Sequence, residues 1–267
     1  MPIQCSIPIE PIGQEAFHEI DRLMLGHAFA VHNEFGRFAK EKLFQAELSR
    51  RCREQGMRAD REVLIRVSFE GFSKDYHLDL LLDGTTVVEA KCVETIAPAH
   101  VGQTLNYLLL TGTQHGSLVN FRGERVARRF VSTRLNPAAR RGFEVSRGDW
   151  PDEPEFRRVE ETIMGLAGDV GLGLDLALYR EAIVALCGGS PEAQVPIHRG
   201  DQFLTDHSMP TISPEIGLAV TALARLTETR HHLQRLLDHT PLRGLVWINL
   251  PLGHLHLDYL RRHPQIS

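Results

Sequence analysis

The sequence predicts an α/β (α+β) protein in which helices cover mixed β-sheets. Stretches of helical period precede and interrupt short runs with strand alternation, and Gly, Pro or polar turns separate the runs. The 267 residues are 42% hydrophobic and 24% charged, which is a globular composition. No apolar stretch is long enough to span a bilayer, so no membrane association is expected.

The elements of the first half follow the order α-α-β-β-β-α-β-β. The first helix is expected to bury a side that includes Leu23 and Val31, and Gly36 provides a break after it. The second helix carries Phe44 and Leu48 at helical spacing. The expected helices are residues 14–33, 38–53 and 98–110, and the expected strands are 62–70, 75–83, 85–92, 116–121 and 125–132. This order predicts a mixed sheet with helices packed against it.

The second half repeats the order as α-β-β-β-α-β-β. The helices are expected at 173–187 and 225–239, and the strands at 193–199, 202–207, 216–224, 244–250 and 254–260. One hypothesis is a degenerate second copy of the same fold, catalytically inactive because 218–226 offers no Glu or Lys, which would make the chain an intramolecular pseudo-dimer. Chance similarity between short amphipathic segments is the alternative. Prolines at 137, 151 and 154 predict two domains, 1–136 and 150–267.

Net charge and cysteine content limit the binding partners and the cellular compartment that can be expected for this chain. The net charge of −4 indicates no global basic field, although a local basic strip could still bind nucleic acid. The four cysteines lie 35 or more residues apart, so reduced thiols in a cytoplasmic protein are expected. The N-terminal stretch MPIQCSIPIEPIGQ lacks the basic and apolar regions of a signal peptide.

The stretch DLLLDGTTVVEAKCVE (79–94) places charges inside an expected buried strand. Leu80 and Leu82 alternate with their neighbours and should face a core, as should Val88 and Ala90 on the next strand. The core-facing residues of the two strands lie on the same face of the sheet only if the residue numbers of each opposed pair add up to an even number. A slip by one residue would turn one strand's core side to solvent.

A three-residue loop between these strands meets that condition, whereas a two-residue Asp-Gly turn does not. The loop pairs Leu82 with Thr86 and therefore brings Asp79 opposite Glu89, with their Cβ atoms roughly 5 Å apart. Lys91 falls on the same face. Two facing carboxylates need a proton or a cation, and oxygen ligands of this kind suit Mg²⁺ or Mn²⁺. An exposed, salt-bridged ladder is the alternative.

Asp79 followed by Glu89-Ala90-Lys91 resembles the signature of the PD-(D/E)XK nuclease superfamily. The surrounding strand-strand-helix order resembles that family's restriction-endonuclease-like αβββαβ core, over about residues 15–132. The resemblance implies that Asp79, Glu89 and the Ala90 carbonyl hold Mg²⁺ (or Mn²⁺), and that Lys91 positions the attacking water.

A second signature, HNEFGRFAKEKLFQAEL (32–48), is similar to that of the bacterial GxxExxY protein family. Gly36 opens the motif, but its Glu falls five residues on, at Glu41, instead of at the family's spacing, and Phe44 stands where the family usually has Tyr. In related nucleases a Glu on this helix joins the metal site, so the resemblance implies that role for Glu41. Glu34 and Glu47 are expected to be solvated helix residues.

The helix after the Lys strand carries QTLNY, which resembles the Q-x-x-x-Y motif of nuclease domains in bacterial recombination complexes. Gln103 and Tyr107 share a helix face, so both are expected to contact the substrate backbone. His100 lies on the same face and is expected to be an orienting or surface residue.

The function expected from this resemblance is divalent-metal-dependent hydrolysis of phosphodiester bonds in DNA (or RNA). Two alternatives stay open: a catalytically weak or inactive nuclease-fold module that binds nucleic acid, and a metal-dependent hydrolase of a small molecule. Eight arginines between residues 122 and 147 predict either a phosphate-binding strip or a solvated linker. The histidines at 231, 232, 239, 254 and 256 are expected at the surface, and Trp247 in the core.

Overall fold

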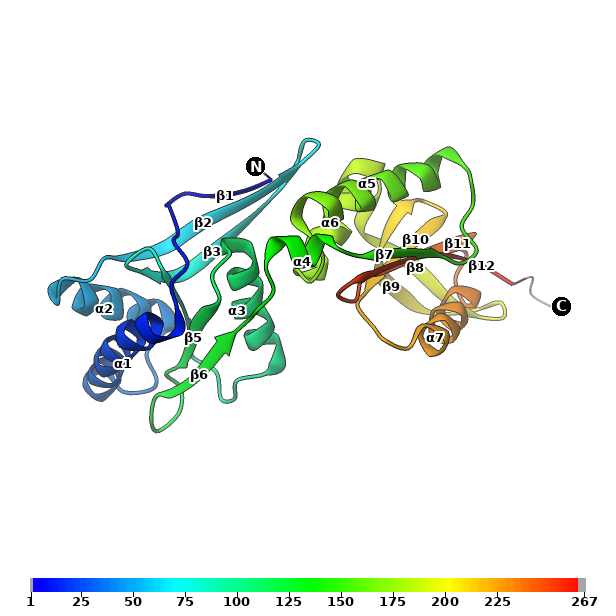
Figure 1. The fold of residues 1–267 in the computed structure, drawn as a ribbon. Coiled ribbons are helices and arrows are strands. Elements are labelled where there is room, and N and C mark those ends of the chain that lie inside the picture. The colour runs from blue at the N-terminus through cyan, green and yellow to red at the C-terminus, as the bar shows by residue number, and fades with distance from the viewer. Residues whose placement is uncertain (1, 264–267) are drawn as a thin grey trace. The chain divides into compact units, whose positions relative to one another are not determined.

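The computed structural model describes residues 2–263, which form two compact units (Figure 1). The N-terminal unit comprises the chain up to residue 68 together with 74–137, and the C-terminal unit comprises 69–73 together with the chain from 138. Each unit is built on its own six-stranded mixed sheet with helices against it, so the predicted fold class is confirmed. None of the helices within residues 2–263 combines the length and apolar character needed to cross a membrane.

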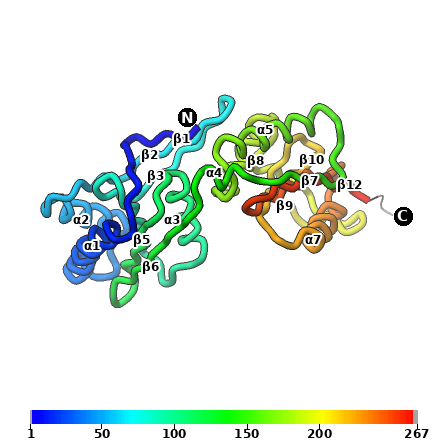
Figure 2. Tube along the Cα trace, viewed as in Figure 1, coloured from blue at the N-terminus to red at the C-terminus, as the bar shows by residue number. Residues whose placement is uncertain are grey.

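The sheet of the N-terminal unit has the strand order β1-β2-β3-β4-β5-β6. β4 and β5 run parallel, whereas the β3–β4 and β5–β6 pairs are antiparallel. β1, which the sequence did not predict, lies antiparallel to β2 along the outer edge (Figure 2). The elements are β1 (Ile3–Cys5), α1 (Gln14–Phe35), α2 (Glu41–Glu54), β2 (Ala59–Phe69), β3 (Phe72–Leu82), β4 (Thr86–Lys91), α3 (Pro98–Thr111), β5 (His115–Asn120) and β6 (Ala127–Ser132).

Helices α1 and α2 cover one face of this sheet, and α3 covers the other. The core beneath α1 and α2 includes Phe44 from α2 stacked on Phe121, with ring centroids 4.4 Å apart. The predicted apolar side of α1 was wrong in part, because Leu23 is exposed. Its buried side carries Phe17, Asp21, Met24, Ala28, Val31 and His32. The spacing of apolar residues did not identify the buried side, because an apolar residue can remain exposed to water and a polar residue can be buried once it is paired.

The buried polar residue of α1 is Asp21, which ties the helix to two strands. Arg128 of β6 donates from Nη2 to Asp21 Oδ2 at 2.5 Å and from Nε to Ser117 Oγ at 3.1 Å. The Ser117 hydroxyl in turn donates to Asp21 Oδ1. Both oxygens of the buried carboxylate are therefore satisfied, which is the condition under which a charge is tolerated in a core.

The sheet of the C-terminal unit has the strand order β7-β12-β11-β10-β9-β8. Helices α5 and α6 lie on one face and α7 on the other (Figure 1). Trp247 is fully buried in the cluster beneath α7, as predicted. The elements are α4 (Pro137–Arg141), β7 (Glu144–Arg147), α5 (Pro154–Val170), α6 (Leu176–Cys187), β8 (Ser190–Arg199), β9 (Gln202–Ser213), β10 (Ile216–Thr221), α7 (Leu226–Asp238), β11 (Gly244–Asn249) and β12 (His254–Arg261).

Helix α5 occupies a stretch in which no helix was predicted from the sequence. Pro154 is its first residue, a position where the missing N–H of proline carries no penalty. Its buried residues recur every three or four positions, at Phe156, Val159, Ile163, Leu166 and Val170. The signals for a helix were present, but the acidic and proline-rich composition hid them.

The two units share one topology. With α5 included, both run α-α-β-β-β-α-β-β, and in both the third and fourth of these strands pair in parallel between antiparallel neighbours. The units differ at the sheet edges, because β1 extends the first sheet beside β2, whereas β7 extends the second beside β12.

A local device also recurs. The Asn120 side chain accepts from the Val93 N–H at 3.0 Å and donates to the Val93 carbonyl at 2.7 Å. Asn249 makes the same two bonds with Leu223, both at 2.8 Å. Each Asn thereby fixes the chain just after the preceding parallel strand.

Candidate active site

The candidate site lies where β3 and β4 separate. The register is the predicted one, with Leu82 opposite Thr86 and Leu80 opposite Val88, and the pairing ends there. Beyond this pair a side chain replaces the backbone as the hydrogen-bond acceptor, since Asp79 Oδ2 accepts the Ala90 N–H at 2.9 Å.

Asp79, Glu89 and Lys91 come together on the face of the sheet that α3 covers. Lys91 Nζ lies 2.5 Å from Glu89 Oε1 and 4.0 Å from Asp79 Oδ2. Glu89 is completely buried, and the side chains of Asp79 and Lys91 are only 14% and 13% exposed. This burial excludes an exposed, salt-bridged ladder.

The burial changes the proton affinities of all three groups. Burial and the nearby Asp79 carboxylate raise the pKa of Glu89 to about 8. Burial also raises the pKa of Asp79, although the Ala90 N–H and the Lys91 ammonium oppose it. For Lys91, burial acts to lower the pKa, but attraction to Glu89 and Asp79 outweighs it and the pKa is raised. Lys91 therefore stays charged while Glu89 titrates near neutral pH.

One oxygen of this cluster has no partner. Glu89 Oε2 is buried and accepts no hydrogen bond from any residue between 2 and 263. A buried oxygen left in this way costs about 1–3 kcal/mol unless a proton or cation satisfies it. The donor set of carboxylate oxygens fits Mg²⁺ or Mn²⁺. Within the described residues no three His, Cys, Asp or Glu side chains converge around one point, and Lys91 Nζ contacts both carboxylates.

Glu41 lies at the same end of β4. It is the first residue of α2, and its Oε2 accepts the Cys92 N–H at 3.2 Å. Its negative charge contributes to the raised pKa values of Asp79 and Glu89, which places it within electrostatic reach of both.

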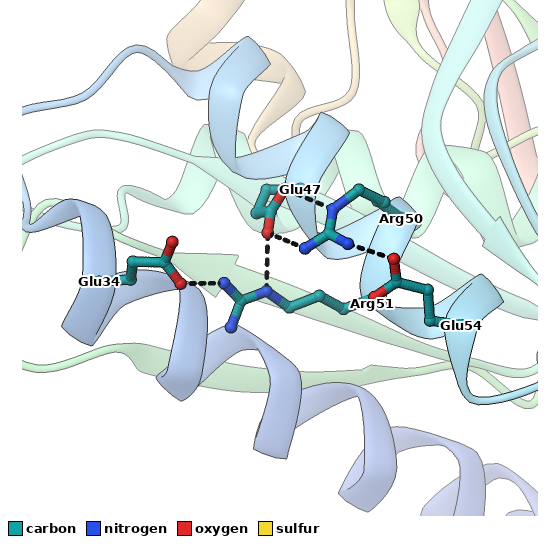
Figure 3. A network of polar contacts seen from close by, with 5 residues as sticks. All are labelled: Glu34, Glu47, Arg50, Arg51 and Glu54. Carbon is teal, nitrogen blue, oxygen red and sulfur yellow. Dashed lines mark hydrogen bonds and ion pairs between the residues drawn. The ribbon is translucent and has the colours of Figure 1, made fainter.

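The other two helix glutamates belong to a surface network. Glu47 binds Arg50 and Arg51 at 2.6 and 2.8 Å, and those hydrogen bonds lower its pKa to about 2 (Figure 3). Arg51 also pairs with Glu34, and Arg50 with Glu54. The Arg51–Glu34 pair therefore links α2 to the end of α1, and Glu47 holds Arg51 from within α2.

Gln103 and Tyr107 of α3 lie together beside the cluster. Gln103 Nε2 donates to the Tyr107 hydroxyl at 3.1 Å. Burial raises the pKa of Tyr107 to about 12, and the charges of Glu89 and Asp79 contribute. His100 has a structural contact at the start of α3, where its Nδ1 accepts the Ala97 N–H at 3.0 Å.

Glu62 is a nearby carboxylate that the sequence reading missed. It lies within β2 with a φ of 51°, a left-handed conformation that is strained for a residue with a side chain. Its charge adds to the raised pKa of Asp79. Strand alternation gives no signal for such a distortion.

The arginine-rich stretch does not form one free strip. Arg122 pairs with Glu94, Arg128 with Asp21 and Arg147 with Glu160, and Arg140 is buried. Those four are engaged in the structure of their own units. Arg125, Arg129, Arg134 and Arg141 are exposed.

The histidines of β12 were expected at the surface, but His254 and His256 are half-buried. Their rings lie 2.8 Å from the hydroxyl of Ser146 on β7, one on each side. The described part of the chain offers no acidic or thiol ligand that would complete a metal site with them.

The raised pKa of Glu89 predicts how stability depends on pH. The folded protein holds this proton up to about pH 8, whereas the unfolded chain loses it near 4.5, so the contribution to stability falls as pH rises through that window. The fall amounts to roughly 3–5 kcal/mol. We expect the unfolding free energy of wild type, measured in EDTA, to decline relative to Glu89→Gln between pH 5 and 8. A constant difference would contradict the raised pKa.

The matching positions of the C-terminal unit carry no charge. Asn120 pairs with Lys91, and Asn249 pairs with Thr221, so Thr221 corresponds to Lys91. Two residues earlier, Ala219 corresponds to Glu89. Continuing the β9–β10 register from Gly217 opposite Thr211 brings Met209 to the position of Asp79. Met209, Ala219 and Trp247 belong to one apolar cluster under α7.

Comparison with known proteins finds a match, which lies in the N-terminal unit. Residues 18–131 match the family model described as PD-(D/E)XK nuclease superfamily. That range includes every residue of the carboxylate cluster as well as Gln103 and Tyr107. No curated protein and no solved structure matches the chain. The resemblance to the GxxExxY family stays a prediction.

Proposed function

We propose, given that residues 18–131 belong to the PD-(D/E)XK nuclease superfamily, that the chain is a nuclease that hydrolyses phosphodiester bonds with the help of Mg²⁺ or Mn²⁺. DNA is the expected substrate, with RNA as the alternative. The observation that carries the proposal is the buried, unpartnered Oε2 of Glu89, next to Asp79 and Lys91. Oxygen ligands beside an ammonium group suit a metal ion and a phosphate better than they suit a structural core.

The residues divide the work as follows. Asp79, Glu89 and the Ala90 carbonyl would hold the ion, with Glu41 assisting from α2. Because Glu89 holds its proton to about pH 8, it must release that proton before both oxygens can act as ligands. Bound Mg²⁺ or Mn²⁺ supplies a Lewis acid that stabilises negative charge on the phosphate.

Lys91 has a second task in this proposal. In the metal-free protein its ammonium group donates a hydrogen bond to Glu89 Oε1, at 2.5 Å. With a cation held by the carboxylates, Lys91 would be free to hold the attacking water by a charge-assisted hydrogen bond. Gln103 and Tyr107 would hold the substrate backbone, since both lie on the helix that covers this face.

The C-terminal unit is, in our proposal, an inactive second copy of the same fold that supports the first or its substrate. The shared strand order and the matching Asn contacts support common descent of the two units. Met209, Ala219 and Thr221 offer no carboxylate for a cation, which supports the loss of activity. An experimental structure in which the two units fail to superpose would overturn the duplication.

The test is a cleavage assay on labelled single- and double-stranded DNA and RNA with Mg²⁺, Mn²⁺ or EDTA. We expect cleavage by the wild type only when metal is present, and at least a hundredfold slower cleavage by Asp79→Asn. Asparagine keeps an oxygen for the Ala90 N–H, so the fold should persist. Metal-independent binding without cleavage would favour a binding module. Neither binding nor cleavage would favour a small-molecule substrate.

A further inference from the structure

Phe38, in the loop between α1 and α2, is the most exposed large apolar side chain in the described part of the chain, with 74% of its surface open. Two guanidinium groups lie over its ring, with Arg37 Cζ 4.9 Å and Arg122 Cζ 5.4 Å from the centroid. A ring that is this open cannot be covered on both faces. It therefore presents free aromatic surface flanked by positive charge.

This aromatic surface lies at the rim of the candidate active site. Glu41 follows Phe38 by three residues, which limits the separation of their Cα atoms to about 11 Å. Arg122 follows Phe121, whose N–H donates to the Lys91 carbonyl at 2.8 Å. A strand within a duplex advances ~3.4 Å per nucleotide and an unpaired strand can extend further, so this distance covers at most about three nucleotides.

We propose that Phe38, with Arg37 and Arg122, stacks an unpaired base of a single-stranded nucleic acid next to the site of cleavage. This inference rests on the proposed function and names its substrate class. Aromatic rings and guanidinium planes both stack on bases, and each stacked base adds to the binding free energy. A site that stacks a base is therefore expected to bind a single strand more tightly than a duplex. A base inside a duplex is already stacked on its neighbours and cannot use the ring.

The arginines distinguish Phe38 from other exposed aromatic residues of the same unit. Phe29 and Phe35 on α1 are 47% and 41% exposed, but neither has a guanidinium group over its ring among residues 2–263. Arg122 is in addition held by Glu94, with Nε 3.2 Å from Oε1. Phe29 therefore serves as the matched control.

The experiment measures binding of the full-length protein in EDTA, where no cleavage occurs. The probes are a single-stranded DNA, an RNA of the same sequence, a blunt duplex, and an abasic strand of the same length. We expect Phe38→Ala to weaken binding to the single strands about five- to a hundredfold. Binding to the duplex and to the abasic strand should stay within about twofold. Phe29→Ala should match the wild type on all four probes.

A second variant reports on the stacking itself. Phe38→Trp should retain single-strand binding, and its added fluorescence should be quenched by a normal strand and not by the abasic one. Equal losses of Phe38→Ala on single strand and duplex would overturn the inference. Unchanged binding of Phe38→Ala to the single strands would overturn it as well. In that case, cleavage by the wild type would still support the proposed function. A wild type that neither binds nor cleaves any nucleic acid would overturn both.

Discussion

Glu89→Gln is expected to reduce metal-dependent cleavage by about a thousandfold or more. Glutamine keeps the shape of the side chain but removes the charge that a divalent cation requires. The loss of several kcal/mol of charge stabilisation corresponds to about three orders of magnitude in rate. The fold should not suffer, because the carboxylate is already costly where it is buried with one unpartnered oxygen.

The measurement is the cleavage rate at saturating Mg²⁺, together with the rise in melting temperature that Mn²⁺ produces. Both should vanish in Glu89→Gln. Glu54→Gln is the matched control, since Glu54 is 57% exposed on α2 and pairs with Arg50. Retention of more than about a tenth of the wild-type rate would contradict the assignment.

Arg128→Ala is expected to lower the unfolding free energy by about 3–5 kcal/mol, because it leaves the Asp21 carboxylate buried and uncompensated. Arg128 Nη2 lies 2.5 Å from Asp21, and its Nε bonds Ser117 at 3.1 Å. Denaturant unfolding provides the measurement. Arg129→Ala, at the next and exposed position of β6, should change stability by less than about 0.5 kcal/mol.

A double variant separates the ion pair from simple truncation. Asp21→Asn with Arg128→Ala removes both charges, so we expect it to recover part of the lost stability. A cost below about 1 kcal/mol for Arg128→Ala would show that this arginine behaves like a surface residue. Arg128 would then be as available for phosphate contacts as the exposed arginines Arg125, Arg129, Arg134 and Arg141.

Local patterns predicted the centre of the fold because they constrain it strongly. The pairing of Leu82 with Thr86 followed from core parity alone, and that parity brings Asp79 close to Glu89. The order of helices and strands from α1 through β6 also followed from period and turn residues. Gly36 ends α1 with a φ of 69°, a conformation that favours glycine.

Features set by distant partners were not predictable. Asp21 is buried only because Arg128, more than a hundred residues later, returns to pair with it. The left-handed backbone of Glu62 leaves the strand pattern unchanged. The contact of Glu41 with the Cys92 N–H depends on how α2 packs against the end of β4. The resemblance to a family implied a role for Glu41, and the spacing of residues did not.

The paired Asn contacts bear on how degenerate copies of such a fold can be recognised. Asn120 and Asn249 hold the same turn in units that differ at every charged position of the cluster. If the C-terminal unit is an inactive copy, as we propose, loss of catalysis would leave this pair of hydrogen bonds under the same folding constraint, because the backbone groups that it satisfies still need partners. A search keyed to acidic residues overlooks the second unit. A search would find it by looking for an apolar strand that ends in Asn, next to a parallel strand after which the chain turns within two residues.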